Sequence, residues 1–396
     1  MFQCFRWPGL FASLVAVVVS TGSVSADVKL IGTAVIPGTT VDLSGLTGLL
    51  NDSIPSNQFG GISALEHLNG DEYLALPDRG PLDGAVPFAC RVQRLKIQVR
   101  PDATPSVTAE ILATTKLTDE AGRKFVGAKA AIDRTHPERS LRFDPEGIRV
   151  QGQRWFISDE YGPHLCEFDL SGKLVRRFQL PARLSIARPN EDPLQENADN
   201  VSGRQANGGL EGLAITPDGE QFFAAMQRPL LQDSVPGENG KRRGRFNRLI
   251  EINIASGATR EFVYPLSDSA NGLSEILAIN AHEFLVIERD SKEGLEAKAK
   301  KIFRIDVRGA TEVSHVESLP ADELPTEIRP VQKRLFLDLL DPRHGLAGEK
   351  SPEKVEGLAF GPPLPDGRRL LLIAVDNDFR SDRPVLFHAF AFDLND

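Results

Sequence analysis

Residues 144–163 read DPEGIRVQGQRWFISDEYGP. An alternating apolar run begins at Glu146-Gly147, a Gln-Gly pair at residues 151–152 follows it, and a second apolar run ends on Ser158-Asp159-Glu160. A glycine-containing pair between two such runs is typical of a β-hairpin. We therefore expect a hairpin that carries carboxylates at both ends of its strand pair.

Four further segments repeat this pattern. They begin at Glu211, Glu275, Glu356 and Gly60, and each returns through a second apolar run to a polar residue. Several are followed by another strand pair, which would give each repeat a four-stranded sheet. Repeated four-stranded sheets are the blades of a β-propeller. The sequence predicts an all-β propeller with five clear blades, and a degenerate sixth could lie within residues 85–140 or 300–350.

The two ends of the chain complete this prediction. Residues 1–26 have the pattern of a secretory signal peptide, with Arg6 before an apolar run and Val24-Ser25-Ala26 at the cleavage position. The apolar run has about ten residues, whereas a membrane-spanning helix needs about 20. We expect a secreted or periplasmic propeller domain over residues 27–396 without a transmembrane segment. A lone strand at Val28 to Ile36 is expected to pair in the C-terminal blade and close the ring.

Charge and missing motifs exclude several classes of function. The formal net charge is −9, and removal of the signal deletes one cation, Arg6. An acidic chain of this kind is unsuited to nucleic acid, which requires a basic face. The sequence contains no GxSxG, Walker loop, HExxH or dinucleotide-binding motif. We expect a monomer that acts on a small anionic or ester substrate.

The repeats also predict a site. Residues at equivalent positions of a propeller converge on its axis, which would gather the carboxylates of Glu146, Glu211, Glu275 and Glu356. Several carboxylates in one place need raised pKa values, cationic partners or a metal. An all-oxygen set suits Ca²⁺. The alternative is that each glutamate accepts backbone N–H bonds or pairs with an arginine and only locks the blades together.

The polar ends of the hairpins supply the other candidates. Loops that follow strand ends on a rigid scaffold often carry function. The predicted substrate-binding residues are Asp78, Arg79, Arg228 and Arg289. The predicted catalytic residues are Asp159, Glu160 and His164, and Asp376 is added to the metal ligands. The alternative for Asp78-Arg79-Gly80-Pro81 is a tight turn with a structural ion pair.

Three other features leave alternatives open. Cys90 and Cys166 could form one disulfide between blades or remain two buried thiols. The polar segment 183–209 has no periodicity and would be either a lid or a disordered loop. A basic cluster, Lys241, Arg242, Arg243 and Arg245, could clamp an anionic substrate or be solvated.

Several blocks of the sequence resemble a known family. DPEGI with ISDEYGP, NGGLEGLAITPDG with AAMQRPL, and VEGLAF with VDNDF resemble successive blocks of the phytase-like family, also described as esterase-like activity of phytase. LPDRGP is similar to the first block of that family. The resemblance implies an exported propeller that hydrolyses phosphoric or carboxylic esters. This chain departs from the glutamate pattern in its first repeat, where Gly60 stands in place of Glu.

By analogy with calcium-dependent propeller phytases and lactonases, the resemblance implies that the four glutamates face a metal and that Arg79, Arg228 and Arg289 face a phosphate. Two functions of different classes follow from the sequence. One is an ester hydrolase in which Ca²⁺ polarises the ester and activates a water. The other is a noncatalytic exported propeller that binds a protein or a glycan.

Overall fold

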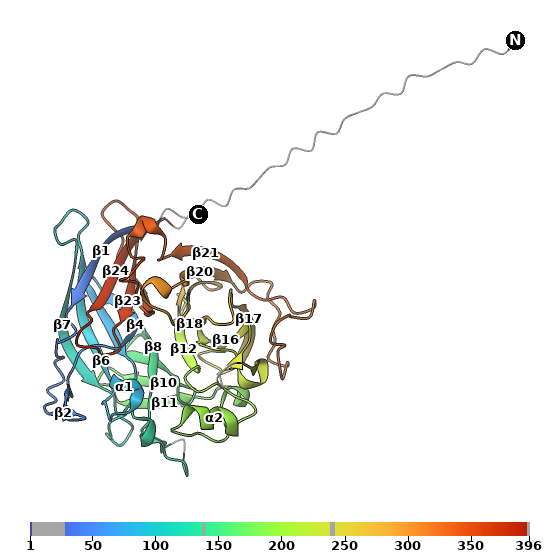
Figure 1. Cartoon of the computed structure of the whole chain (residues 1–396), viewed down its shortest axis with the longest axis horizontal. Helices are drawn as coiled ribbons and strands as arrows, with labels where there is room; N and C mark the ends of the chain where they lie inside the picture. Colours follow the sequence, from blue (N-terminus) through green and yellow to red (C-terminus); the bar gives the residue numbers. More distant parts are fainter. Residues whose placement is uncertain (2–27, 137–138, 238–241, 394–396) are drawn as a thin grey trace.

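The computed structural model describes Met1 and residues 28–136, 139–237 and 242–393. Apart from Met1, the predicted signal segment therefore lies outside the described residues. Five four-stranded antiparallel sheets, called blades 1 to 5 below, form the molecule (Figure 1). The predicted all-β propeller with five blades is confirmed, and the described part of the chain holds no sixth four-stranded sheet.

Each blade runs from an innermost strand, named first, to an outermost strand, named last. Blade 1 consists of β4 (Ile62–Asn69), β5 (Glu72–Pro77), β6 (Arg91–Val99) and β7 (Val107–Lys116). Blade 2 consists of β8 (Pro145–Gln151), β9 (Arg154–Asp159), β10 (His164–Asp169) and β11 (Leu174–Phe178). Blade 3 consists of β12 (Leu210–Ile215), β13 (Gln221–Met226), β16 (Phe246–Asn253) and β17 (Thr259–Pro265). Blade 4 consists of β18 (Gly272–Ala278), β19 (Glu283–Arg289), β20 (Lys300–Asp306) and β21 (Gln332–Asp338). Blade 5 consists of β22 (Lys354–Phe360), β23 (Arg369–Asp376), β24 (Val385–Phe392) and β1 (Lys29–Ile36).

Blade 5 combines the two ends of the described chain. Its outer strand, β1, pairs antiparallel with β24, with Lys29 opposite Ala391 and Ile36 opposite Val385. The N-terminal strand thus lies beside strands from the C-terminal end. This pairing covers one edge of β24, which would otherwise present unpaired N–H and C=O groups.

Local sequence explains the hairpins. Gln151 pairs with Arg154, so the turn between β8 and β9 contains only Gly152 and Gln153. Gly152 has φ 59°, a conformation that glycine adopts without steric cost. The Gln-Gly pair therefore sets the register of the hairpin that carries Glu146 and Glu160.

The core is divided among the blade interfaces. One buried apolar cluster lies between each pair of neighbouring blades, including the pair of blades 5 and 1. For example, Leu74 of β5 and Ile148 of β8 share one cluster, while Leu95 of β6 and Phe387 of β24 share another. Burial of apolar surface at every interface stabilises the ring as one body.

The five innermost strands approach one another closely at the axis. In Figure 1, β4, β8, β12 and β18 are labelled near the middle of the molecule, with β7, β17 and β21 further out. A Cβ at Gly147 of β8 would lie 2.8 Å from the backbone N of Leu213 in β12. A Cβ at Gly212 would lie 2.6 Å from the N of Ile276 in β18. The glycine after Glu146 and after Glu211 is therefore required by contact between blades.

Arg149 of β8 fills the axis on one side of these glycines. Its side chain is buried, and its guanidinium donates to the carbonyl of Leu65 at 3.2 Å and to that of Ile276 at 2.8 Å. It thereby ties blade 2 to blades 1 and 4.

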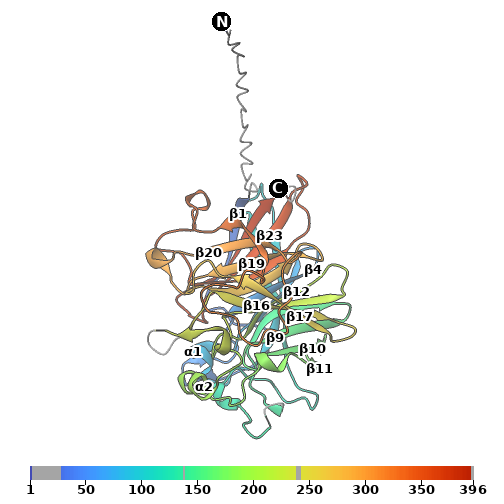
Figure 2. The same ribbon diagram turned by 90° about the vertical axis from the view of Figure 1, so that its right-hand side faces the viewer.

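The remaining elements are short and lie in the loops that connect the strands of the blades. They are the turn α1 (Pro81–Gly84), helix α2 (Pro193–Asp199), and the two-stranded sheets β2 (Leu49–Leu50) with β3 (Ile54–Pro55) and β14 (Val235–Pro236) with β15 (Arg242–Arg243). Short 3₁₀ helices cover Lys129–Ala131, Ala182–Leu184, Leu231–Asp233, Gly294–Glu296 and Pro342–His344. Figure 2 shows α1 and α2 on the same side of the sheets. Within the described residues, no helix has both the length and the apolar character needed to cross a membrane.

The two cysteines among the described residues do not form the disulfide that the sequence left open. Cys90 and Cys166 are free and buried, and both belong to the apolar cluster between blades 1 and 2. Burial raises the pKa of both thiols, which disfavours the reactive thiolate.

Candidate functional site

Every innermost strand has an irregularity in its pairing at the same place. The register with the second strand of the blade shifts near Ser63, Glu146, Glu211, Ser274 and Glu356. An extra residue in one strand of a pair is a β-bulge, and bulges commonly redirect a side chain beside a functional site. These five residues are equivalent in the fold and are called the bulge residues below.

This alignment corrects the predicted glutamate set. Glu275 is not equivalent to Glu146, because Ile276 is the residue that aligns with Ile148, and the bulge residue of blade 4 is Ser274. Glu275 lies instead at the position that glycine occupies in blades 2, 3 and 5. Its carboxylate pairs with Arg149 at 3.1 Å and accepts the N–H groups of Leu213 and Ile276.

Glu275 therefore accepts backbone N–H bonds and pairs with an arginine. This is the blade-locking role that the sequence offered as the alternative for all four glutamates. The sequence aligns Gly60 with the glutamates of the other repeats. The structure corrects this alignment, because the bulge residue of blade 1 is Ser63. Of the four glutamates expected to converge on the axis, Glu146, Glu211 and Glu356 line one cavity, and Glu275 does not.

That cavity, the acid cavity, has a volume of about 40 Å³, comparable to the space of one ion or water. Its lining is entirely polar. The residues that line it are Ser63, Asp78, Arg79, Glu146, Glu160, Asn207, Glu211, Gln227, Arg289, Lys354 and Glu356. Five carboxylates thus face three cationic side chains.

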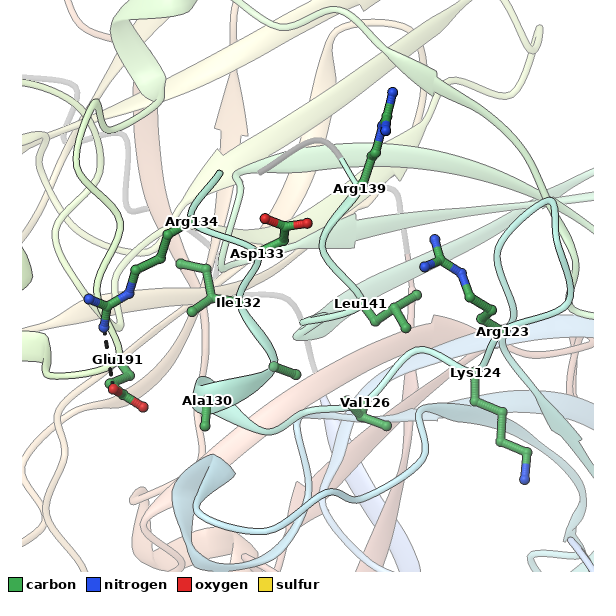
Figure 3. A pocket seen from close by; sticks show the side chains of 11 residues that line it. Arg123, Lys124, Val126, Ala130, Ile132, Asp133, Arg134, Arg139, Leu141 and Glu191 are labelled. Carbon is green, nitrogen blue, oxygen red and sulfur yellow. Dashed lines mark hydrogen bonds and ion pairs between the residues drawn. The ribbon is translucent and has the colours of Figure 1, made fainter. Parts of the chain in front are cut away.

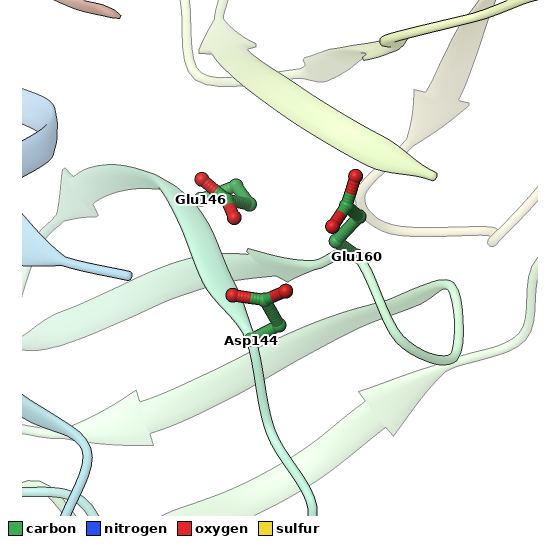
Figure 4. A group of neighbouring side chains, drawn as sticks. All are labelled: Asp144, Glu146 and Glu160. Atoms are coloured by element: carbon green, nitrogen blue, oxygen red, sulfur yellow. The ribbon is translucent and has the colours of Figure 1, made fainter. Parts of the chain in front are cut away.

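Blade 2 brings three of its carboxyl groups together. Figure 4 shows Asp144 before β8, Glu146 on β8 and Glu160 after β9, and one oxygen of each lies within 4.8 Å of the others. All three residues are buried. Burial raises the pKa of Asp144 to about 7, although the charge of Arg79 opposes this shift.

Arg79 organises this group from the end of blade 1. Its Nη1 donates to Asp144 and, at 2.9 Å, to Glu160, while Nη2 donates to Asn207. The backbone N–H of Arg79 also donates to Asp144 at 3.0 Å. Although burial alone would lower the pKa of Arg79, the surrounding carboxylates raise it well above its usual range.

Two carboxylates of the acid cavity have no cationic partner. Among the described residues, no ion pair joins either Glu146 or Glu211 to a lysine, arginine or histidine. Glu211 is 3% exposed, and Gln227 donates to its Oε1 at 2.6 Å. Its Oε2 is buried and has no hydrogen-bond partner in the part of the chain that the structure describes. Burial, followed by nearby carboxylates, raises the pKa of both groups well above the usual range.

On the other side of the acid cavity, the carboxylates pair with cationic side chains. Arg289 pairs with Glu356 and also donates to Ser274 at 2.7 Å, so it connects the bulge residues of blades 4 and 5. Lys354 pairs with Asp376 at 3.1 Å and lies 3.9 Å from Asp78. Asp376 does not line the acid cavity and contacts Lys354 behind it.

The three predicted catalytic residues lie in different settings. Glu160 lines the acid cavity, whereas Asp159 and His164 do not. Asp159 accepts the backbone N–H of Asp144 at 2.7 Å and that of Gly162 at 2.9 Å, so it holds the backbone on which Asp144 and Glu160 stand. Their catalytic roles stay predictions.

The long polar segment 183–209 is ordered and reaches the acid cavity. Its helix α2 is fixed by the ion pair of Glu196 with Arg204 at 2.6 Å. Beyond it, Asn207 lines the acid cavity and the backbone N–H of Gly209 faces Glu160 Oε1 at 3.3 Å. The segment therefore contributes directly to the site.

Two larger cavities lie outside this site. One of about 760 Å³ is lined by Arg123, Lys124, Arg134 and Asp133 among others, and Figure 3 shows the ion pair of Arg134 with Glu191 there, at 3.3 Å. The other, of about 940 Å³, lies between the loops of blades 4 and 5 and reaches Asp376.

The basic cluster near residue 242 is mostly engaged within the protein. Arg242 donates to Ser234 and to the carbonyl of Leu231, and Arg243 pairs with Asp322 at 2.8 Å. Lys241 lies outside the described residues.

Several cavity residues were not among the sequence candidates. They are Ser63, Asn207, Gln227 and Lys354, together with the neighbouring Asp144 and Ser274. Asp144 and Lys354 each stand two residues before a bulge glutamate, and this shared spacing could have pointed to them. Nothing comparable marks Asn207, which belongs to no repeat.

The chain is similar to several known proteins. The sequence profile of the phytase-like family, described as esterase-like activity of phytase, matches residues 57–379. An uncharacterized secreted protein of Arthroderma benhamiae is 26% identical over an alignment that covers 69% of this chain and 66% of that protein. The chain thus spans slightly less than two thirds of that relative.

Two solved structures are similar in outline. Myxococcus xanthus glutaminyl cyclase has a TM-score of 0.39 and 8% identity, with 92% of this chain and 97% of that chain covered. The Malassezia sympodialis allergen Mala s 1 has a TM-score of 0.35 and 11% identity, with 85% and 93% covered. Neither likeness is close enough to indicate function. The match over residues 57–379 spans most of the sequence, and the chain belongs to the phytase-like family.

Proposed function

We propose that this protein is an exported hydrolase of phosphoric or carboxylic esters whose acid cavity binds a divalent cation, with Ca²⁺ as the first candidate. The proposal rests on two buried carboxylates, Glu146 and Glu211, which form no ion pair with a cationic side chain among the described residues. Within the same residues, Glu211 Oε2 also has no hydrogen bond. A buried charge is costly unless it is paired or binds a metal.

The donor set fits calcium. Only carboxylate, amide and hydroxyl oxygens are available as ligands in the lining, and Ca²⁺ prefers oxygen at about 2.3–2.6 Å. Two ligands of one such ion can lie up to about 5 Å apart. The spacing within 4.8 Å of Asp144, Glu146 and Glu160 is compatible with this limit. Glu146 and Glu211 would be the principal ligands, because Arg79 already neutralises Asp144 and Glu160.

The proposed reaction also requires a proton acceptor and residues that position it. A bound Ca²⁺ would polarise the ester or phosphoryl oxygen and lower the pKa of a water beside it. Glu160, which lines the cavity, is placed to accept a proton from that water, and Arg79 holds it in position at 2.9 Å. Asp159 acts as a positioning residue through its hydrogen bond to the backbone of Asp144.

Export is part of the proposal. It is supported by the signal pattern of residues 1–26 and by a relative that is described as secreted.

The test combines a substitution with metal removal. Glu146→Gln and a chelator should each abolish hydrolysis of p-nitrophenyl phosphate, phytate or a short-chain p-nitrophenyl ester, because both remove the cation. Glu275→Gln is the matched control, since Glu275 lies outside the cavity, and it should keep its activity. Activity retained both in Glu146→Gln and with chelator would contradict the proposal. A protein that hydrolyses none of these substrates and binds a cell-envelope partner would favour the noncatalytic alternative.

A further inference from the structure

Lys354 lines the acid cavity, and carboxylates surround its ammonium group. Its Nζ lies 3.1 Å from an oxygen of Asp376 and 3.9 Å from one of Asp78. It also pairs with Asp378. The side chain of Asp376 is fully buried, and a buried carboxylate is costly unless a cation compensates its charge. Lys354 therefore supplies the positive charge that this side of the cavity requires.

The strands fix Lys354 in this place. It begins β22 and pairs in register with Asp376, the last residue of β23. Opposite charges that face each other across two paired strands stabilise the pair. Lys354 stands two residues before the bulge residue Glu356, just as Asp144 stands two residues before Glu146. One position of the fold thus carries an ammonium group in blade 5 and a carboxylate in blade 2.

The charges of the lining balance with one divalent cation. Five carboxylates face three cationic side chains, so two negative charges remain when all are ionised, and one Ca²⁺ neutralises them. Arg228 follows Gln227 and does not line the cavity, so its charge is not part of this balance. Without Lys354, three negative charges would remain, and Asp376 behind the lining would lose its cation.

We propose that Lys354 is a resident cation that occupies the place of a second divalent ion, so that the acid cavity takes only one, at Glu146 and Glu211. A place surrounded by carboxylate oxygens suits Ca²⁺ as well as an ammonium group. The inference deepens the proposed function and rests on it for the ion at Glu146 and Glu211. It also assigns Asp376 to Lys354, whereas the sequence placed Asp376 among the metal ligands.

The position of the single ion follows from the same arrangement. Arg289 pairs with Glu356, whose charge also acts on Lys354, so the two cations lie on one side of the cavity. Both would repel a divalent ion from that side. Glu146 and Glu211 form no ion pair with a cationic side chain among the described residues. An ion that enters the cavity is therefore directed to these two glutamates.

The number of calcium ions per chain tests the inference. Each protein is freed of metal with a chelator and titrated with Ca²⁺ by calorimetry, up to about 1 mM free ion. We expect one ion in the wild type and two in Lys354→Met, which removes the charge and adds no oxygen ligand. Lys354→Arg, which keeps the charge, should bind one. Adding Asp376→Asn to Lys354→Met should return the number to one, because it removes a carboxylate from the second site.

Lys333→Met is the matched control. Lys333 is also a largely buried lysine that pairs with a buried carboxylate, Glu288, but neither residue lines the acid cavity. This variant should bind one ion. Thermal unfolding followed by circular dichroism shows that each variant is folded, and Ca²⁺ should raise the melting temperature of Lys354→Met more than that of the wild type. A single ion in Lys354→Met would overturn the inference.

Asp376→Asn alone tests the inference if Lys354→Met does not fold. It should bind one ion with an affinity within about threefold of the wild type, because Asp376 contacts Lys354 and not the ion. A larger loss of affinity would make Asp376 a metal ligand and would contradict its assignment to Lys354.

The same titrations separate this inference from the metal proposal. One ion in both the wild type and Lys354→Met overturns the inference and leaves the calcium site at Glu146 and Glu211 standing. No ion in the wild type and one in Lys354→Met removes that calcium site and supports Lys354 as a resident cation. No ion in either protein removes both.

Discussion

Among single residues, Glu146 and Glu275 differ in what their carboxylates contact. Both are buried glutamates near the axis, but Glu146 faces other carboxylates whereas Glu275 pairs with Arg149. A one-residue difference in strand register separates a cavity position from a position between blades.

Glu275 should make the stability of the propeller depend on pH. Burial raises its pKa from 4.5 to about 7, against the effect of Arg149 and two backbone N–H groups. A carboxyl whose pKa is raised by folding binds its proton more tightly in the folded state. Its contribution to stability is complete below about pH 4.5 and is lost as the pH rises through about 7.

We predict that Glu275→Gln, which cannot ionise, loses less stability than the wild type between pH 5 and 8. The difference between the two losses should be on the order of 1–3 kcal/mol in the free energy of unfolding, measured by denaturant titration at each pH. The exposed Glu317→Gln should follow the wild-type curve. Parallel curves for wild type and Glu275→Gln would show that the carboxyl does not titrate in this range. Burial also raises the pKa of Glu66 to about 7. Glu66 is present in all three proteins, so its titration contributes equally to the three stability curves.

At the scale of elements, the hairpins were predictable because their signals are local. Alternating apolar residues and a glycine turn determine a strand pair without reference to the rest of the chain. The five repeats and the strand at Lys29–Ile36 could be predicted in this way. The outer strands of blade 1, β6 and β7, and the outermost strand of blade 4, β21, lie in the two segments where a degenerate sixth blade was thought possible, so the complete strand order was not predicted.

The bulges could not be predicted in this way. Their position depends on how the innermost strand pairs with its neighbour, and the Ser274-Glu275 pair looks like a shifted copy of Glu-Gly. Asn207 was missed for a different reason, since it comes from a nonrepeating segment that is positioned only by the folded blades.

The glycine that follows each bulge glutamate tests the packing of the innermost strands. Gly147→Ala should lower the free energy of unfolding by about 2–4 kcal/mol, because its Cβ would lie 2.8 Å from both the backbone N and the Cβ of Leu213. Gly272→Ala, whose nearest contact would be at 3.3 Å, should cost less than about 1 kcal/mol. Chemical denaturation gives both values. Similar costs for the two variants would mean that contact between β8 and β12 is not what requires the glycine.

At the scale of the whole molecule, the ring depends on packing at all five blade interfaces. Blade 5 is the blade that a truncation of the N-terminal end would disrupt, because its outer strand β1 comes from that end while its other strands come from the C-terminal end. Deletion of residues 28–36 would expose the edge of β24 and leave a three-stranded blade.

We predict that this deletion lowers the melting temperature of the propeller by about 10 °C or more, or abolishes cooperative unfolding. Val35→Lys is the control, since Val35 is exposed on β1 and its substitution leaves the pairing in place. Differential scanning calorimetry compares the three proteins. A truncated protein as stable as the wild type would mean that β1 contributes little to the ring.

The closure of the ring also brings acidic side chains together at the axis. Glu146, Glu211 and Glu356 lie on three different blades and become neighbours only when the blades close around them, so their charges accumulate in a volume of about 40 Å³. Three cationic side chains are present for five carboxylates. A divalent cation would complete the balance at Glu146 and Glu211.

Calcium titration by calorimetry, after removal of metal by a chelator, tests this claim most directly. We predict one Ca²⁺ bound per chain, with affinity reduced at least about tenfold in Glu146→Gln and Glu211→Gln and unchanged in Glu275→Gln. Absence of calcium binding, or a loss of affinity in Glu275→Gln as large as in Glu146→Gln, would contradict a calcium site at the axis.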